Sequence, residues 1–176
     1  MKVICISGQA RAGKDVTADI IQQQLESEGN KVFRVAYADY LKGICRRLAG
    51  WDGIEKPREL LQTLGTDIVR NKLGMKDFWV QHVIKEIKIA EELGYTHTII
   101  SDCRFPNEVY IPKAEFEECV SVRVKRINFD SNLTKEQKLH ESETSMDNFK
   151  FDVIIRAMDG IENLRSVVLS RMGDFR

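Results

Sequence analysis

A glycine-flanked loop near the start of the chain has the residue types that hold phosphate. In GQARAGKD, residues 8–15, Gly8, Gly13 and Lys14 have the spacing of a P-loop. Glycines allow the tight turn that aims backbone N–H groups at phosphate oxygens, and the lysine neutralises the charge of the β and γ phosphates. The pattern predicts an ATP site whose contacts are Gly8, Ala10, Arg11, Ala12, Gly13, Lys14, Asp15 and Val16.

The residue after Lys14 departs from the usual motif, in which a Ser or Thr hydroxyl holds Mg²⁺. Asp15 stands there, and its carboxylate could bind Mg²⁺ directly or through water. It could also act only as an acidic residue in the first helical turn, which stabilises by roughly 0.3–1 kcal/mol. Alternatively, the hydroxyl of Thr17 could face the metal. We favour Asp15, because a carboxylate beside a triphosphate is costly unless a cation lies between them.

A second acidic residue, Asp102, follows the apolar stretch THTIIS. In a parallel sheet, ligands bind at the carboxyl ends of strands, and an Asp there can hold Mg²⁺ or its waters. Arg104 follows by two residues and can clamp a phosphate with two N–H groups, and Asn107 and Glu108 can add polar contacts or cap the next helix. The alternative is a local Asp102–Arg104 ion pair. We expect Lys14, Asp102 and Arg104 to be catalytic, and Asp15 and Asp102 to be the metal ligands.

The elements that position these residues follow from hydrophobic patterning. Short apolar runs, typical of buried parallel strands, alternate with segments of helical periodicity. Strands are predicted over residues 3–6, 32–37, 96–101, 120–127 and 151–155. Helices are predicted over residues 14–28, 40–48, 57–73, 78–93, 106–118 and 161–172. This alternation indicates one α/β domain over residues 1–176, with a five-stranded parallel sheet covered on both faces.

Composition narrows the function classes. The 176 residues carry 27 basic and 27 acidic side chains, a balance that gives no support to a nucleic-acid binder. No apolar run approaches the roughly 18 residues of a membrane helix, so we expect no membrane partner. The four cysteines lack paired C-x-x-C spacing and are typical of reduced, mostly buried thiols in a cytoplasmic protein.

Five blocks in order carry a family resemblance: GQARAGKD; AYADYLK; RELLQTLGTDIVR with the following DFW; SDCRFPNEV; and HESE before FDVII. Together they resemble the deoxynucleoside monophosphate kinases of tailed phages, within the P-loop nucleoside monophosphate (NMP) kinases. The resemblance covers nearly the whole chain, and the Asp-x-x-Phe-Pro pattern at residues 102–106 is also similar to adenylate kinases.

The resemblance implies a three-layer P-loop NTPase fold with an NMP-binding helical arm over residues 37–78 and a lid over residues 128–149. These are the two excursions that interrupt the strand–helix alternation, and the second is polar and without apolar periodicity. The implied monophosphate site consists of Asp39, Lys42, Arg58, Gln62, Thr66, Arg70 and Arg104. Trp79 could stack on a base, but its helical position favours a place in the core.

Two departures from the family pattern concern the loop and the lid. Several relatives have Thr where this chain has Val16, and HESE, residues 140–143, has Glu141 in place of Pro. Arg123, Lys125 and Arg126 lie just before the lid and are candidates for neutralising charge in the transition state. Lys125 and Arg126 point to opposite faces of the strand, and the pattern does not distinguish between them. We take Arg126 as the catalytic candidate.

The implied reaction is Mg²⁺-dependent transfer from ATP to a deoxynucleoside monophosphate (dNMP), which gives ADP and the diphosphate. It requires positioning and charge neutralisation rather than a strong general base. Small-molecule nucleotides are therefore the expected partners, a homodimer is left open, and the host cytoplasm is the expected location for a phage-encoded chain. Two alternatives remain: a P-loop kinase for another small phosphorylated acceptor, and a nucleotide-binding switch protein with slow hydrolysis.

Overall fold

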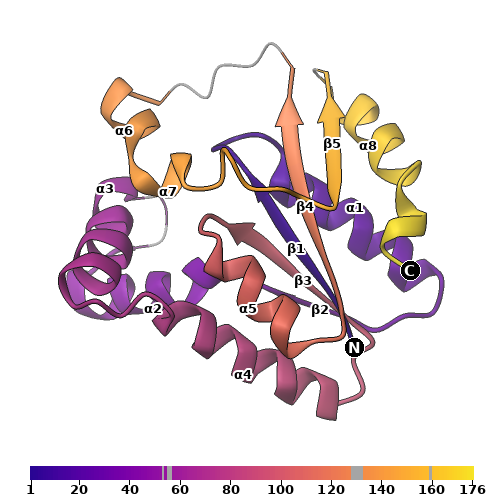
Figure 1. Ribbon diagram of the computed structural model, residues 1–176, viewed down its shortest axis with the longest axis horizontal. Helices are drawn as coiled ribbons and strands as arrows, with labels where there is room; N and C mark the ends of the chain where they lie inside the picture. Colours follow the sequence, from indigo (N-terminus) through magenta and orange to yellow (C-terminus); the bar gives the residue numbers. More distant parts are fainter. Residues whose placement is uncertain (53, 55–56, 128–132, 159) are drawn as a thin grey trace.

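One parallel sheet organises the molecule (Figure 1). The computed structural model describes residues 1–52, 54, 57–127, 133–158 and 160–176. The strands are β1 (Lys2–Gly8), β2 (Val32–Val35), β3 (His97–Cys103), β4 (Glu118–Arg126) and β5 (Val153–Ala157). Their order is β2-β3-β1-β4-β5, and every neighbouring pair is parallel, which confirms the predicted α/β fold.

Helices connect the strands and cover both faces of the sheet. They are α1 (Lys14–Ser27), α2 (Tyr37–Ala49), α3 (Arg58–Gln62), α4 (Phe78–Glu92), α5 (Asn107–Glu115), α6 (Lys135–Leu139), α7 (Glu141–Thr144) and α8 (Ile161–Leu169). A π-helix, η1 (Thr63–Lys72), follows α3, and a 3₁₀ turn, η2 (Met172–Asp174), follows α8. In the described part of the chain, no helix combines the length and apolar character needed to cross a bilayer.

Strand β1 separates two hydrophobic layers. Its side chains alternate, so Val3 and Cys5 join the cluster that contains residues of α2, α4 and α5. Ile4 and Ile6 join the opposite cluster, which contains residues of α1 and α8. All four are fully buried, as predicted for a central strand covered on both faces. This packing fixes the carboxyl end of β1, from which the glycine-flanked loop leaves the sheet.

The boundary between β2 and α2 differs from the prediction. The pattern predicted a strand to residue 37 and a helix from residue 40, whereas β2 ends at Val35 and α2 begins at Tyr37. The helix begins earlier than predicted because its first residues contact Asp102, which is distant in sequence. The carboxylate of Asp102 accepts hydrogen bonds from the backbone N–H groups of Tyr37 at 2.8 Å and Ala38 at 3.0 Å. Asp102 thereby satisfies two donors at the start of a helix and draws Tyr37 into it.

The segment expected to be the arm, residues 37–78, contains an unusual helix; residues 53, 55 and 56 lie outside the described residues. One helix interrupted near Gly65 was predicted over residues 57–73, but the chain forms α3 and then ten residues of π-helix. The indole Nε1 of Trp79 donates to the Gly65 carbonyl at 3.0 Å, within a buried contact. The wider π turn is a feature often found at functional sites.

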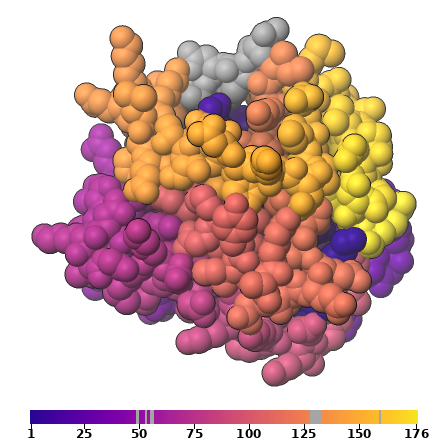
Figure 2. Space-filling model, viewed as in Figure 1, coloured from indigo at the N-terminus to yellow at the C-terminus, as the bar shows by residue number. Residues whose placement is uncertain are grey.

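The segment expected to be the lid contains two helices that its polar pattern did not predict. Residues 128–132 of the predicted lid lie outside the described residues, and we name the remainder, residues 133–149, the lid segment. It lies against the arm (Figure 2). The amide of Asn71 donates to a Glu141 carboxylate oxygen at 3.1 Å, and His140 Nε2 lies 3.5 Å from an Asp67 carboxylate oxygen.

Candidate active site

The loop after β1 has the local geometry of a phosphate cradle. At Gly8, an added Cβ would lie 2.8 Å from the Val124 carbonyl oxygen, so only glycine fits without a shift. Gly13 has φ 94°, a left-handed conformation that favours glycine, and it directly precedes α1. The loop therefore brings backbone N–H groups and the positive end of α1 to the carboxyl edge of the sheet.

Lys14 folds over this loop. Its buried Nζ donates to the carbonyl oxygens of Gly8 and Gln9, both at 2.9 Å. Burial, and then the nearby positive charge of Arg104, lower the pKa of Lys14 to about 8. An anion bound at the loop would oppose both effects, because it would add negative charge to that of Glu143, Asp15 and Asp102 near Lys14.

One cavity lies beside the loop, and a second cavity shares part of its wall. The first, which we call the P-loop cavity, has a volume of about 600 Å³. Its lining residues are Ala10, Arg11, Lys14, Asp15, Arg34, Val35, Ala36, Ala38, Asp39, Lys42, Arg58, Ser101, Asp102 and Arg104. The second, the arm cavity, has a volume of about 100 Å³. It is lined by Tyr37, Ala38, Leu41, Arg58, Leu61, Gln62, Gly65, Thr66, Arg70, Trp79, Asp102, Arg104, Phe105, Glu108, Ser142 and Glu143.

The cavities meet at four residues that line both of them: Ala38, Arg58, Asp102 and Arg104. Two arginines and a carboxylate thus stand between a phosphate cradle and a pocket with Tyr37 and Trp79 in its wall. Guanidinium groups neutralise phosphate oxygens on both sides of such a junction. The arrangement can hold two phosphorylated molecules with their phosphates facing each other.

Asp102 has a structural partner as well as a place at this junction. Each of its carboxylate oxygens accepts one backbone N–H of α2, which leaves further lone pairs on both oxygens. Burial raises its pKa, against the lowering effect of those two hydrogen bonds. Asp102 therefore fixes the start of the arm relative to β3, and it retains acceptor capacity toward the P-loop cavity.

Asp15 and Thr17, the two alternative metal ligands on the P-loop side, differ in their access to the P-loop cavity. The Asp15 side chain lines the P-loop cavity, is 83% exposed and lies 3.4 Å from Arg34 Nη2. Thr17 is fully buried, its hydroxyl has no hydrogen-bond partner among the described residues, and it lines neither cavity. A hydrated Mg²⁺ near the cavity could reach Asp15 and Asp102, and Mg²⁺ commonly uses one or two carboxylates together with substrate phosphates.

The residues expected around the monophosphate divide between the cavities. Gln62, Thr66 and Arg70 line the arm cavity. Asp39 and Lys42 instead line the P-loop cavity, where their side chains pair at 2.7 Å.

Not every expected residue reaches a cavity wall. Among the expected ATP contacts, Gly8, Ala12, Gly13 and Val16 line neither cavity, and Gly8 and Gly13 act through the shape of the loop. Arg126, the last residue of β4, is also absent from both linings.

Arg70 is held in the arm cavity by several partners. Its guanidinium lies 3.7 Å from the centre of the Phe105 ring and donates at 2.8 Å to the Lys76 carbonyl and to Asn107 Oδ1. It also lies 3.7 Å from the buried carboxylate of Glu108. Burial raises the pKa of Glu108 to about 7, and Arg70 opposes that rise. These contacts assign Arg70 a structural task in addition to its place on the cavity wall.

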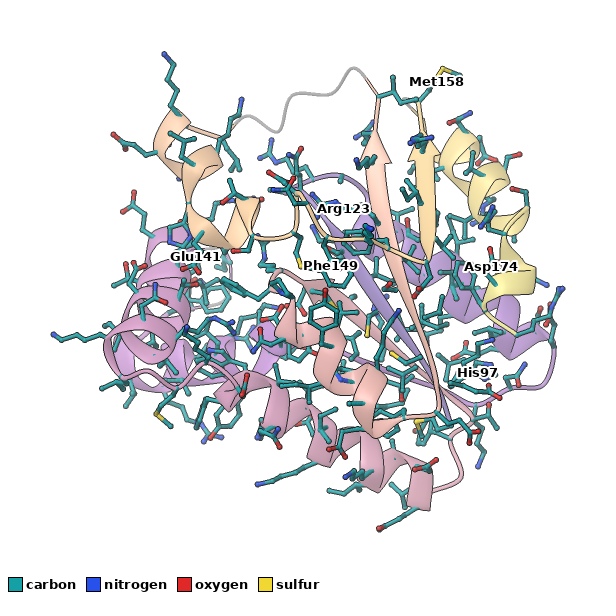
Figure 3. All side chains as sticks on the ribbon, in the orientation of Figure 1. His97, Arg123, Glu141, Phe149, Met158 and Asp174 are labelled. Carbon is teal, nitrogen blue, oxygen red and sulfur yellow. The ribbon has the colours of Figure 1, made fainter. Side chains whose placement is uncertain are left out.

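Glu143 joins the site through the fold rather than through a motif, whereas Arg123, one of the three basic candidates before the lid, lines neither cavity. Glu143 of the lid segment accepts a hydrogen bond from the Ala10 N–H at 3.1 Å and pairs with Arg104. Arg123 of β4 donates to Ser7 Oγ at 3.0 Å and pairs with Asp147 at 3.2 Å (Figure 3). The HESE block drew attention to Glu143, but nothing in the sequence placed it against the loop more than 130 residues away.

The chain is similar to known proteins both in sequence and in fold. The model of the family described as deoxynucleotide monophosphate kinase matches residues 52–168, more than half of the chain, in a stretch that begins after the P-loop. A sugar kinase from Janibacter sp. HTCC2649 has a TM-score of 0.55 at 10% identity, and the alignment covers 97% of this chain and 93% of that one. This likeness shows that the two chains share a fold. The APS kinase of Mycobacterium tuberculosis, solved with AMPPNP and APS, has a TM-score of 0.49 at 10% identity, with 98% and 97% covered. The curated protein sequences gave no match.

Proposed function

Because the chain belongs to the deoxynucleotide monophosphate kinase family, we propose that it transfers the γ-phosphoryl group of ATP to a deoxynucleoside 5′-monophosphate. Family membership makes it a nucleotide kinase, which speaks against the switch-protein alternative. The observation that carries the proposal is the junction of the two cavities. Arg58 and Arg104 lie between the P-loop cavity and the arm cavity, whose wall is largely apolar. Two phosphorylated substrates that meet there require positive charge at this position.

In the proposed reaction, a non-bridging oxygen of the acceptor phosphate attacks the γ phosphorus of ATP. The new O–P bond forms as the bond to the β-phosphate oxygen breaks, and ADP leaves with the electron pair. Lys14 and the loop N–H groups would hold the donor phosphates, and Arg58 and Arg104 would hold the acceptor phosphate and the transferring group. The attacking oxygen is already anionic, so no general base is needed.

Asp15 and Asp102 would hold a Mg²⁺ ion, which would supply positive charge against the negative charge that develops on the transferring group. The acceptor's base and sugar are assigned to the arm cavity, whose apolar wall contains Tyr37, Leu41 and Trp79. Bases favour such surfaces because their faces stack on aromatic rings. The lid segment would exclude water from the transferring group and so suppress hydrolysis of ATP.

The test is ADP formation from ATP and Mg²⁺ with each of the four dNMPs and the four ribonucleotides in turn. We expect at least one dNMP to raise the rate about tenfold or more above the acceptor-free rate and to be converted to its diphosphate. If no nucleoside monophosphate stimulates ADP formation, the acceptor is a different phosphorylated molecule and the proposal is wrong.

A further inference from the structure

The carboxylate of Glu143 occupies an anion site between the two cavities. Its Oε2 accepts the backbone N–H of Ala10, a P-loop residue, at 3.1 Å. Its Oε1 pairs with the guanidinium of Arg104, and the side chain is 6% exposed. Backbone N–H groups of a P-loop and arginine guanidinium groups are the two kinds of donor that bind phosphate. In this structure a protein carboxylate uses one of each.

Further positive charge surrounds the same carboxylate. Burial lowers the pKa of Lys14, and the negative charge of Glu143 opposes that change. Burial also lowers the pKa of Arg123, and Asp147 and Glu143 oppose it. Glu143 is therefore close enough to influence Lys14 of α1 and Arg123 of β4 as well as Arg104, which follows β3. A buried carboxylate is costly unless it is paired, so its stability here depends on these cations and on Ala10.

The lid segment carries this carboxylate to its place. The Ser142 carbonyl accepts a hydrogen bond from Arg104 at 3.1 Å, so two consecutive residues of α7 dock on one guanidinium. Glu141, the residue before them, faces the arm through Asn71 (Figure 3). Glu143 lines the arm cavity and Ala10 lines the P-loop cavity, so their hydrogen bond crosses from one cavity to the other.

We propose that Glu143 is an internal substitute for the transferable phosphate. Its carboxylate holds the Ala10 N–H and Arg104 while no nucleotide is bound. When substrate phosphates take those donors, Glu143 leaves, and the lid segment then covers the transferring group from a different position. The inference rests on the proposed function, because it assigns the junction to phosphoryl transfer. Two anions cannot share one set of donors, so Glu143 competes with phosphate and couples the position of the lid segment to occupancy of the site. Glu143 is a positioning residue: it acts through Arg104 and the lid.

The competition predicts an unusual gain of affinity on substitution. Glu143→Gln removes the charge and keeps the shape, so pyrophosphate no longer has to displace a charged hydrogen-bond acceptor. Loss of one such competing bond corresponds to about tenfold tighter binding of pyrophosphate, measured by calorimetry without any acceptor. Glu141→Gln is the matched control, because it removes the same charge two residues away from the junction; its affinity is expected to stay within about twofold of wild type.

A residue with only a structural role would give the opposite result. Unchanged or weaker pyrophosphate binding by Glu143→Gln, with Glu141→Gln normal, overturns the inference. The wild-type chain offers a second measurement that does not depend on folding of a variant. Pyrophosphate should raise hydrogen exchange in α7, because docking of Ser142 and Glu143 is lost; unchanged or reduced exchange there contradicts the proposal.

The outcomes also separate this inference from the proposed kinase activity. Stimulation of ADP formation by a dNMP, together with unchanged pyrophosphate affinity in Glu143→Gln, rejects the role of Glu143 alone. The opposite outcome is tighter pyrophosphate binding by Glu143→Gln without stimulation of ADP formation by any nucleoside monophosphate. It rejects the proposed acceptor and supports the role of Glu143 as a substitute for phosphate.

Discussion

The P-loop cavity and the arm cavity share a border but differ in how they are built. The P-loop cavity has a volume of about 600 Å³, and its phosphate cradle takes Ala10, Arg11, Lys14 and Asp15 from one continuous stretch of the P-loop and the start of α1; the other lining residues come from β2, α2, α3 and the end of β3 with the residues that follow these strands. The arm cavity has about 100 Å³ and combines residues from α2, α3, η1, α4, the end of β3, α5 and the lid segment. Its polar residues also have structural partners, as Arg70 and Glu108 show. A local motif can thus specify the local half of the site, which is the phosphate cradle, whereas the arm cavity depends on the whole fold.

The largest expected effect tests the local half. Lys14→Ala should lower turnover about 10³-fold, because a preorganised charge aimed at the transferring phosphate is lost. Stability should hardly fall, since burial already disfavours the charged form of Lys14, whose pKa is about 8. Turnover with the best acceptor and the melting temperature are the measurements. Lys88→Ala, at a surface pair with Glu115, is the control. Turnover within tenfold of wild type would contradict the P-loop assignment.

The second prediction contrasts two arginines of the arm cavity. Above pH 7, where Glu108 is ionised, Arg70→Ala should lower the free energy of unfolding by about 3–5 kcal/mol, because it leaves the Glu108 carboxylate buried without its cation and removes the contact with Phe105. Arg58→Ala should change stability by less than about 1 kcal/mol. Its main effect should be on the acceptor, whose KM is expected to rise about tenfold as one charged contact to the phosphate is lost. Denaturant titration and acceptor kinetics separate the two effects; equal loss of stability in both variants would remove the distinction.

These contrasts also explain what the sequence could predict. The apolar segment at residues 3–6 is buried on both faces, as its composition predicted, and the five strands predicted from hydrophobic patterning are the five strands of the sheet. The loop at residues 8–15 was recognisable because its function depends on backbone conformation within a few residues. Both features are local, and both agree with the structure where it tests them.

The remaining features depend on contacts between distant residues. The start of α2 is fixed by the carboxylate of Asp102, which is 64 residues away from Ala38. The placement of Glu143 depends on Ala10, at a separation of 133 residues. Neither partner can be identified from periodicity, because a charged residue on a polar segment has the same pattern whether it faces solvent or a buried donor. The sequence pattern therefore identified Asp102 as a residue with useful chemistry, but it did not predict that Asp102 fixes the start of the arm.

The third prediction concerns pH and the buried carboxyl group of the arm cavity. Burial raises the pKa of Glu108 from 4.5 to about 7. Below pH 4.5 both states hold the proton; between pH 4.5 and 7 only the folded state keeps it, so this group lowers stability as pH rises. The loss should approach about 3 kcal/mol above pH 7. Glu108→Gln retains an acceptor for the Arg104 and Phe105 N–H groups and should have a flatter stability profile over this range. Parallel profiles of the two proteins would show that Glu108 titrates normally.

The smallest expected effects decide which oxygen faces the metal on the P-loop side. Asp15→Asn should change the free energy of unfolding by less than about 1 kcal/mol, because the side chain is exposed and contributes only through the helix dipole and Arg34. The Mg²⁺ concentration for half-maximal turnover should nevertheless rise several-fold, since the carboxylate would hold the ion or its water. Thr17→Val removes a buried hydroxyl that has no partner among the described residues, so it should preserve or raise stability and leave the Mg²⁺ requirement unchanged. The reverse pattern, with the Mg²⁺ requirement raised only by Thr17→Val, would transfer the metal contact to Thr17. The local half of the site would then also depend on more than a few consecutive residues, because Thr17 can reach a metal only if its surroundings open.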